Sequence, residues 1–205
     1  MKNAKKVLLL VLCAVLLVGA SVAGTLAYLT SQDTVTNTFT VGNVIITLDE
    51  AKVDEYGKLL YKTDEANKFA TTGTELADRV DENSYKLIPG HTYTKDPTIH
   101  VAEDSEACWL FVKIENGNDN ATINGLVENG WTQIEQSQYW AYKGATVGAN
   151  SSIPVFNSFT YGSSVANTSS DADTKIIVTA YAIQADGFET ADAAWAALAT
   201  QLQLK

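Results

Sequence analysis

Few residues of this chain carry the chemistry of a metal or catalytic site. Its 205 residues include two histidines, His91 and His100, and zinc sites commonly use histidine. The sequence contains no H-E-x-x-H motif, and a spacing of nine in a regular strand points the two rings to opposite faces. A bulge at Pro97 would change that parity. We expect hydrogen-bonded strand histidines rather than zinc ligands, with no metal site and no cofactor.

Nucleophilic catalysis and calcium binding have as little local support. The sequence contains no G-x-S-x-G motif, and Cys108 begins an apolar run in which burial would disfavour its thiolate. We expect this cysteine to be a small buried residue rather than half of an intermolecular disulfide. Residues 116–120 and 171–173 are rich in Asn and Asp, but ordinary turns explain them better than a calcium loop does. We predict no catalytic residue and a protein that is not an enzyme.

Residues 1–27 have the three parts of a secretory signal peptide. Three lysines precede an apolar run over residues 7–18, and small residues then allow cleavage after Ala23 or after Ala27. The apolar run is shorter than the roughly 20 residues that a membrane-spanning helix needs. We predict a secreted protein that meets the membrane only through its uncleaved signal.

The chain is acidic, with 24 Asp and Glu against 14 Lys and Arg and a formal net charge of −10. The signal holds three of the lysines and no acid, so the mature chain is more acidic still. Such a charge argues against nucleic acid or anionic lipid as a partner. Cleavage after Ala27 leaves 178 residues, which suits a single domain over residues 28–205.

The mature chain begins with a predicted strand, Tyr28–Val41. Val35, Asn37, Phe39 and Val41 alternate with threonines, which is typical of a half-buried β-strand. Gly42 and Asn43 interrupt the alternation, and residues 44–48 predict a second strand.

Further along the chain, short apolar segments separated by turn residues predict an antiparallel β-sandwich. The expected strands cover residues 92–101, 108–115, 151–160 and 175–185, with a hairpin over 131–144. Pro97 cannot donate to a ladder, so it places its strand at an edge or on a bulge.

Two regions depart from this pattern of strands. Residues 51–85 are charged and predict an excursion that is either a partner-facing surface or a variable insertion. We expect a short hairpin there, with residues 58–62 as one arm, and one or two helical turns over 74–80. A helix over residues 190–203 is expected to begin at Thr190 and to pack on the sandwich through Trp195, Leu198 and Leu202.

The stretch from Gly24 to Glu50 resembles the TasA/camelysin family of biofilm-matrix fibre proteins of Gram-positive bacteria. The family pattern is a G-T-x-A signal end, an aromatic-led strand rich in Thr and Ser, T-F-x-x-G, and an apolar strand that ends in an acid. The matching residues are Gly24, Thr25, Ala27, Tyr28, Thr38, Phe39, Gly42, Leu48 and Asp49. A second family element, P-G-x-x-x-x-K-D, is matched by Pro89, Gly90, Lys95 and Asp96.

The resemblance implies a jelly-roll fold, residence in the biofilm matrix or at the cell surface, and cleavage by a SipW-type signal peptidase. The cut would fall between Ala27 and Tyr28, with Thr25 at the other small position. The camelysin branch of the family has been classed as metallopeptidase.

Three functions follow from these observations. The first is an extracellular fibre in which the strand Tyr28–Val41 is donated to a neighbouring copy, although the same strand could pair within its own domain. The second is a monomeric adhesion or carbohydrate-binding module, whose aromatic platform could come from Trp131, Tyr139, Trp140 and Tyr142 unless these side chains form core. The metallopeptidase is the least favoured.

Overall fold

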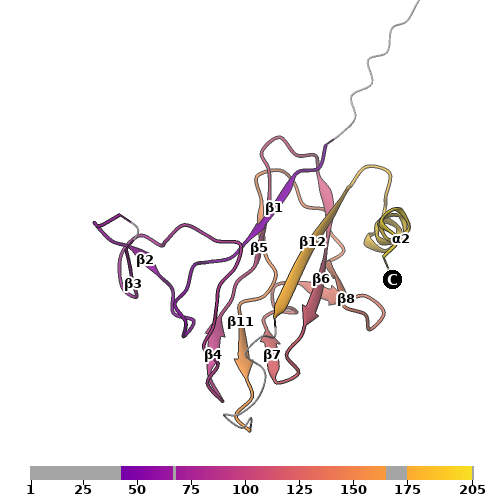
Figure 1. Ribbon diagram of the computed structural model, residues 1–205. Helices are drawn as coiled ribbons and strands as arrows, with labels where there is room; N and C mark the ends of the chain where they lie inside the picture. The colour runs from indigo at the N-terminus through magenta and orange to yellow at the C-terminus, as the bar shows by residue number, and fades with distance from the viewer. Residues whose placement is uncertain (1–42, 67, 165–174, 205) are drawn as a thin grey trace, which may run out of the picture. The chain divides into compact units, whose positions relative to one another are not determined.

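The structure is a computed structural model that describes residues 43–66, 68–164 and 175–204 (Figure 1). Its strands are β1 (Ile46–Asp49), β2 (Tyr61–Lys62), β3 (Phe69–Ala70), β4 (Thr92–Thr94), β5 (Thr98–Val101), β6 (Cys108–Asn116), β7 (Ala121–Asn124), β8 (Trp131–Gln133), β9 (Tyr139–Tyr142), β10 (Ser152–Pro154), β11 (Ser158–Tyr161) and β12 (Ile176–Gln184). One helix, α2 (Ala191–Leu202), follows them.

The strands form several antiparallel sheets, which confirms the prediction of an all-β fold with a short C-terminal helix. The sheet orders are β1-β5-β10, β4-β11-β7, β12-β6-β9-β8 and the small pair β2-β3. The predicted hairpin over 131–144 is present as the pair β8 and β9, with Trp131 opposite Tyr142.

Strand β6 is the centre of the packing, because both of its faces are buried. Leu110 and Val112 lie in a core with Ile99 of β5 and Val178 of β12. The opposite face of β6 packs Trp109 and Phe111 against the helix. This two-sided burial explains why β6 is a continuous apolar run rather than an alternating one.

Helix α2 begins where the sequence predicts and packs on the sheet. The Thr190 side chain accepts a hydrogen bond from the Ala193 backbone N–H at 3.2 Å, as an N-cap does. Leu198 is buried, and Trp195 packs against the same cluster, its ring centroid 5.2 Å from that of Phe111. Leu202 was expected on the same stripe but is 46% exposed, and Ala194 is buried instead.

The predicted continuous strand over residues 92–101 is wrong. Its two halves are β4 and β5, which belong to different sheets. Pro97 lies between them and, having no N–H to donate, ends one ladder before the next begins. The expectation of an edge strand holds for β4, which is at the edge of β4-β11-β7, and fails for β5, which is the middle strand of β1-β5-β10.

The region 51–85 contains the expected hairpin but not the expected helical turns. The arms of the hairpin are β2 and β3. Residues 74–80 are extended, with isolated bridges that join Leu76 to Tyr61 and Val80 to Glu50. These long-range pairings outweigh the local helical preference of the segment.

Other predicted strands have shifted or divided bounds. The strand expected over 44–48 is β1, and the segment 151–160 divides into β10 and β11. The signal with Thr25, Ala27 and Tyr28, the donor-strand residues Val35, Asn37, Phe39 and Val41, and the cluster 171–173 lie outside the described residues. In the part of the chain that is described, no helix is long and apolar enough to span a membrane.

Candidate functional site

Strand β12 has one paired edge and one open edge. Its nine residues run antiparallel to β6 from Ile176 opposite Asn116 to Gln184 opposite Cys108. Just beyond the ends of the strand, the Gly117 N–H donates to the Lys175 carbonyl at 2.9 Å and the Ala185 N–H donates to the Ala107 carbonyl at 2.7 Å. Among residues 43–66, 68–164 and 175–204, no strand pairs with the other edge of β12.

The alternation of an antiparallel ladder decides which backbone groups face the open edge. Lys175 and Ala185 are bonded to the β6 side, so the odd-numbered residues between them direct their N–H and C=O toward β6. The even-numbered residues direct these groups away from β6; they are Ile176, Val178, Ala180, Ala182 and Gln184. The open edge is therefore a row of backbone donors and acceptors that an added strand could pair with.

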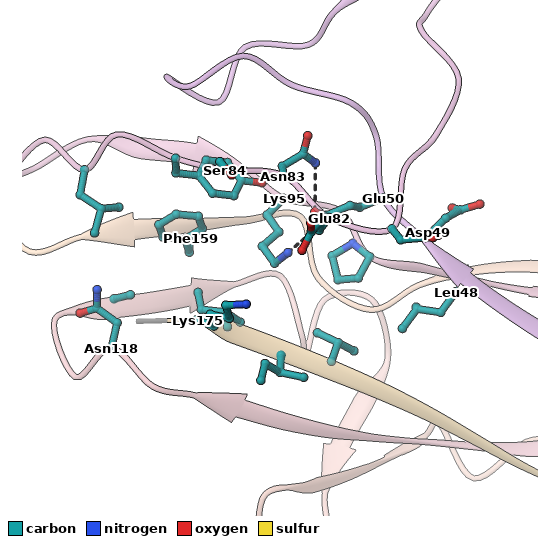
Figure 2. Close-up of a pocket in the computed structure, with 18 residues that line it drawn as sticks. Leu48, Asp49, Glu50, Glu82, Asn83, Ser84, Lys95, Asn118, Phe159 and Lys175 are labelled. Carbon is teal, nitrogen blue, oxygen red and sulfur yellow. Dashed lines mark hydrogen bonds and ion pairs between the residues drawn. The ribbon is translucent and has the colours of Figure 1, made fainter. Parts of the chain in front are cut away.

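A cleft of about 760 Å³ lies beside the first half of this edge (Figure 2). Strands β1 and β12, which belong to different sheets, both contribute to it. The lining residues are Leu48, Asp49, Glu50, Asp81, Glu82, Asn83, Ser84, Tyr85, Leu87, Lys95, Pro97, Asn118, Ala121, Phe159, Lys175, Ile176, Ile177 and Val178. The last part of the charged excursion thus forms one wall.

The apolar part of the cleft is aromatic and aliphatic. The Tyr85 ring meets the Phe159 ring edge-on, with centroids 5.1 Å apart, and Ile176 packs against the same cluster. Burial, and then the negative charges of Glu50 and Asp96, raise the pKa of Tyr85 well above its usual value. Its hydroxyl therefore stays protonated and donates to the Thr94 carbonyl at 3.1 Å.

A polar group, here called the cleft polar centre, consists of Glu50, Lys95 and Asn83 (Figure 2). The Lys95 ammonium bonds one carboxylate oxygen of Glu50, whose side chain is only 4% exposed. The Asn83 amide donates to the other oxygen at 3.0 Å and to the Ala51 carbonyl at 2.9 Å. Asn83 also accepts from the Val53 N–H at 3.1 Å, so its amide is held in one orientation.

Further hydrogen bonds with distant segments hold the residues that follow β1. Asp96 accepts a hydrogen bond from the Ala51 N–H at 2.7 Å, and Glu50 exchanges two backbone hydrogen bonds with Val80, each 2.8 Å. Lys95 and Asp96 therefore both bond to the residues that follow β1 and join this wall of the cleft to a distant segment.

Asp49, the last residue of β1, forms an ion pair with Arg79 and a hydrogen bond with His100. Burial alone would raise the pKa of Asp49, but hydrogen bonds from Arg79 and His100 outweigh it and hold the pKa below 3.8. A carboxyl with a lowered folded-state pKa stabilises the fold above its unfolded pKa of about 3.9, and that stability is lost as pH falls through the folded value.

We therefore expect the stability advantage of the native protein over Asp49→Asn to shrink as pH falls below about 4. Free energies of unfolding measured in urea from pH 6 to pH 2 test this. A difference that stays constant over that range would contradict the role of the ionised carboxylate.

The structure brings together a Ser–His–Asp row that the sequence did not reveal. The two ring nitrogens of His100 contact Ser152 Oγ at 2.8 Å and Asp49 Oδ1 at 2.9 Å, across three neighbouring strands. The row resembles a hydrolase triad in its residue types. Asp49 is shared with Arg79, and neither His100 nor Ser152 lines the cleft, so the contacts serve to join β1, β5 and β10.

His91 and His100 lie in different settings and share no ligand. The His91 Nε2 contacts the Tyr56 carbonyl at 2.9 Å, and its ring meets the Tyr93 ring edge-on. Within the described ranges, no group of three or more His, Cys, Asp or Glu residues is placed to hold a metal ion. In the Asn-rich turn, Asn116 and Asn118 accept backbone N–H groups two residues on, at 3.1 and 3.0 Å, as ordinary turn residues do.

Cys108 is fully buried, which confirms the expected state of this residue. Burial raises the pKa of its thiol to about 11. We expect a thiol reagent such as dithionitrobenzoate to leave the folded protein unmodified at pH 8 and to react after unfolding in urea. Rapid labelling without denaturant would contradict this burial.

The proposed aromatic platform is largely core. Trp131 is 1% exposed and donates its indole N–H to the Pro154 carbonyl at 2.9 Å. Tyr139 is buried, and Trp140 and Tyr142 are half-buried against the central core. These four residues do not form an exposed surface on which a sugar ring could stack.

The chain matches no protein-family model, no curated protein and no solved structure.

Proposed function

We propose that this protein is a secreted structural subunit that assembles into extracellular fibres by strand donation. The mature N-terminal strand, Tyr28–Val41, would add to the open edge of β12 in the next copy and enter the cleft beside it. The observation that carries the proposal is a nine-residue strand, next to a cleft of about 760 Å³, with one edge that no described strand pairs with. Exposed edges of this kind are the usual templates for strand addition between chains.

The donated strand suits this cleft in pattern and in charge. Its alternation provides one face for the apolar wall, and its threonines provide a second face for solvent. Asp33 is its one charged side chain, so a nearly neutral strand would enter a cleft that already holds four acids and two lysines. Backbone pairing gives affinity that depends little on sequence, and the alternate side chains give specificity.

The proposal extends to the whole chain. Residues 1–27 would direct export and be removed by a SipW-type signal peptidase, and residues 28–205 would form one jelly-roll-like β-sandwich. The family resemblance at Gly24 to Glu50 supports a place in the biofilm matrix or at the surface of a Gram-positive bacterium. Partners are then other copies of the chain, with no nucleic acid and with membrane contact only before cleavage.

A catalytic role has weaker support. His100 and Ser152 do not line the cleft, and Cys108 is buried and protonated. His91, which precedes β4, and His100 of β5 make hydrogen bonds with different partners. We therefore propose a structural protein rather than a hydrolase or a metallopeptidase.

Electron microscopy of the purified protein tests this proposal. Protein beginning at Tyr28 should form fibres, whereas protein beginning at Gly42, which lacks the donor strand, should not. The described residues all belong to one compact unit, so the shorter chain should remain folded. Fibres from the shorter chain, or none from the longer chain at high concentration, would overturn strand donation.

A further inference from the structure

We propose that Asn37 of the donated strand binds the cleft polar centre of the neighbouring copy and thereby sets the register of donation. This inference rests on the proposed function and names the contact that selects one alignment among several. The occupant of the cleft is residues 28–41 of a second copy of this chain.

The inward face of the donor strand has a single polar residue in its last part. Val35, Phe39 and Val41 are apolar, and Asn37 stands between them. A carboxamide that is buried without hydrogen-bond partners costs free energy, so Asn37 has to reach a polar group wherever the strand docks. If no polar group lay opposite this position, an apolar residue would fit the apolar face of the strand better.

The cleft polar centre has the donor and the acceptor that a carboxamide needs. An ammonium has three N–H donors, and among the described residues Lys95 uses one of them on Glu50. Each carboxylate oxygen can accept two hydrogen bonds, and the described partners of Glu50 are Lys95 and Asn83. The Asn37 carbonyl can accept from Lys95 while its NH₂ donates to Glu50, so both groups of the carboxamide are paired.

Register is the property that this contact would decide. Alternation alone prevents a slip of one residue, because such a slip would turn the threonines inward. A slip of two residues keeps the apolar face inward and is not prevented by the pattern. It would move Asn37 by about 6.6 Å and place Val35 or Phe39 on the charged pair, which would then lose its water without gaining a partner. A single buried Asn fixes register in coiled coils by the same penalty.

A dimer assay isolates this contact from fibre growth. The donor copy begins at Tyr28 and carries Val178→Pro to close its own acceptor edge. The acceptor copy begins at Gly42 and has no strand to donate. We expect the pair to bind one to one, Asn37→Val in the donor to weaken binding about tenfold or more, and the outward-facing control Thr38→Val to leave it unchanged.

A second acceptor reverses the preference. With Glu50→Leu and Lys95→Met together, the charged pair of the polar centre becomes apolar, and the Asn37→Val donor should now bind more tightly than the native donor. Circular dichroism checks that this acceptor is folded. The comparison of the donors on the native acceptor does not depend on this variant.

The outcomes separate the two proposals. If the native donor does not bind the native acceptor, strand donation itself is wrong. If it binds and Asn37→Val binds as tightly, donation stands and the role of Asn37 is wrong. If the native donor still binds the Glu50→Leu/Lys95→Met acceptor more tightly than the Asn37→Val donor does, the role of Asn37 at the cleft polar centre is also wrong. That result would point to another polar site, such as Asn118 at the other end of the cleft (Figure 2).

Discussion

Val178→Pro is expected to abolish fibre formation while the domain stays folded. The Val178 N–H faces the open edge of β12, so proline removes a group that an incoming strand needs without removing a bond to β6. The proline ring also obstructs the approach of another backbone. Sedimentation of assembled protein, with electron microscopy of the pellet, measures the effect, and we expect the assembled fraction to fall to background.

Two matched variants control for damage to the fold. Val178→Ala loses the same core contacts but keeps the N–H, so it should assemble. Thr179→Pro places proline at a position whose N–H faces β6, and it should lower the melting temperature more than Val178→Pro does. Fibres from Val178→Pro at the native concentration would show that the open edge of β12 is not the acceptor.

Lys95→Met is expected to lower the free energy of unfolding by about 3 kcal/mol or more. The variant leaves the Glu50 carboxylate buried, at 4% exposure, with the Asn83 amide as its remaining described side-chain partner. Removing one member of a buried ion pair is costly because the other charge keeps its desolvation penalty. Urea denaturation at pH 7 measures the loss.

The double variant Glu50→Leu/Lys95→Met distinguishes a buried charge from lost packing. An apolar pair of similar size commonly restores stability at such sites, so most of the loss should be recovered. A double variant that is as unstable as Lys95→Met would contradict this explanation. The native pair then adds little stability over an apolar pair, which is expected if its role is to recognise a strand.

Local sequence patterns predicted the elements whose burial depends on their own residues. The apolar run from Cys108 is β6, and the segment 175–185 is β12. Both could be predicted because each is long enough and is apolar on the faces it buries. The Trp131 hairpin and the Thr190 cap also depend on neighbouring residues. The predictions of helical turns over 74–80 and of one strand through Pro97 were wrong. The structure of these segments depends on contacts with Glu50 and Tyr61 and on two different sheets.

The cleft could not be predicted, because its residues are brought together by the fold. Glu50, Asn83 and Lys95 come from three separate segments, and periodicity carries no information on which of them meet. In the sequence, Lys95 and Asp96 stood out only through a family resemblance. In the structure, both contact residues that follow β1.

Isotope-resolved photo-crosslinking tests the central claim most directly. Protein beginning at Tyr28, labelled with ¹⁵N and carrying benzoylphenylalanine in place of Phe39, is assembled with unlabelled native protein and irradiated. Strand donation predicts cross-links from the labelled residue to unlabelled peptides that contain the cleft residues, above all 83–97 and 175–184. Cross-links confined to labelled peptides, or to surfaces away from β12, would mean that the strand pairs within its own domain or docks elsewhere, and would contradict the account.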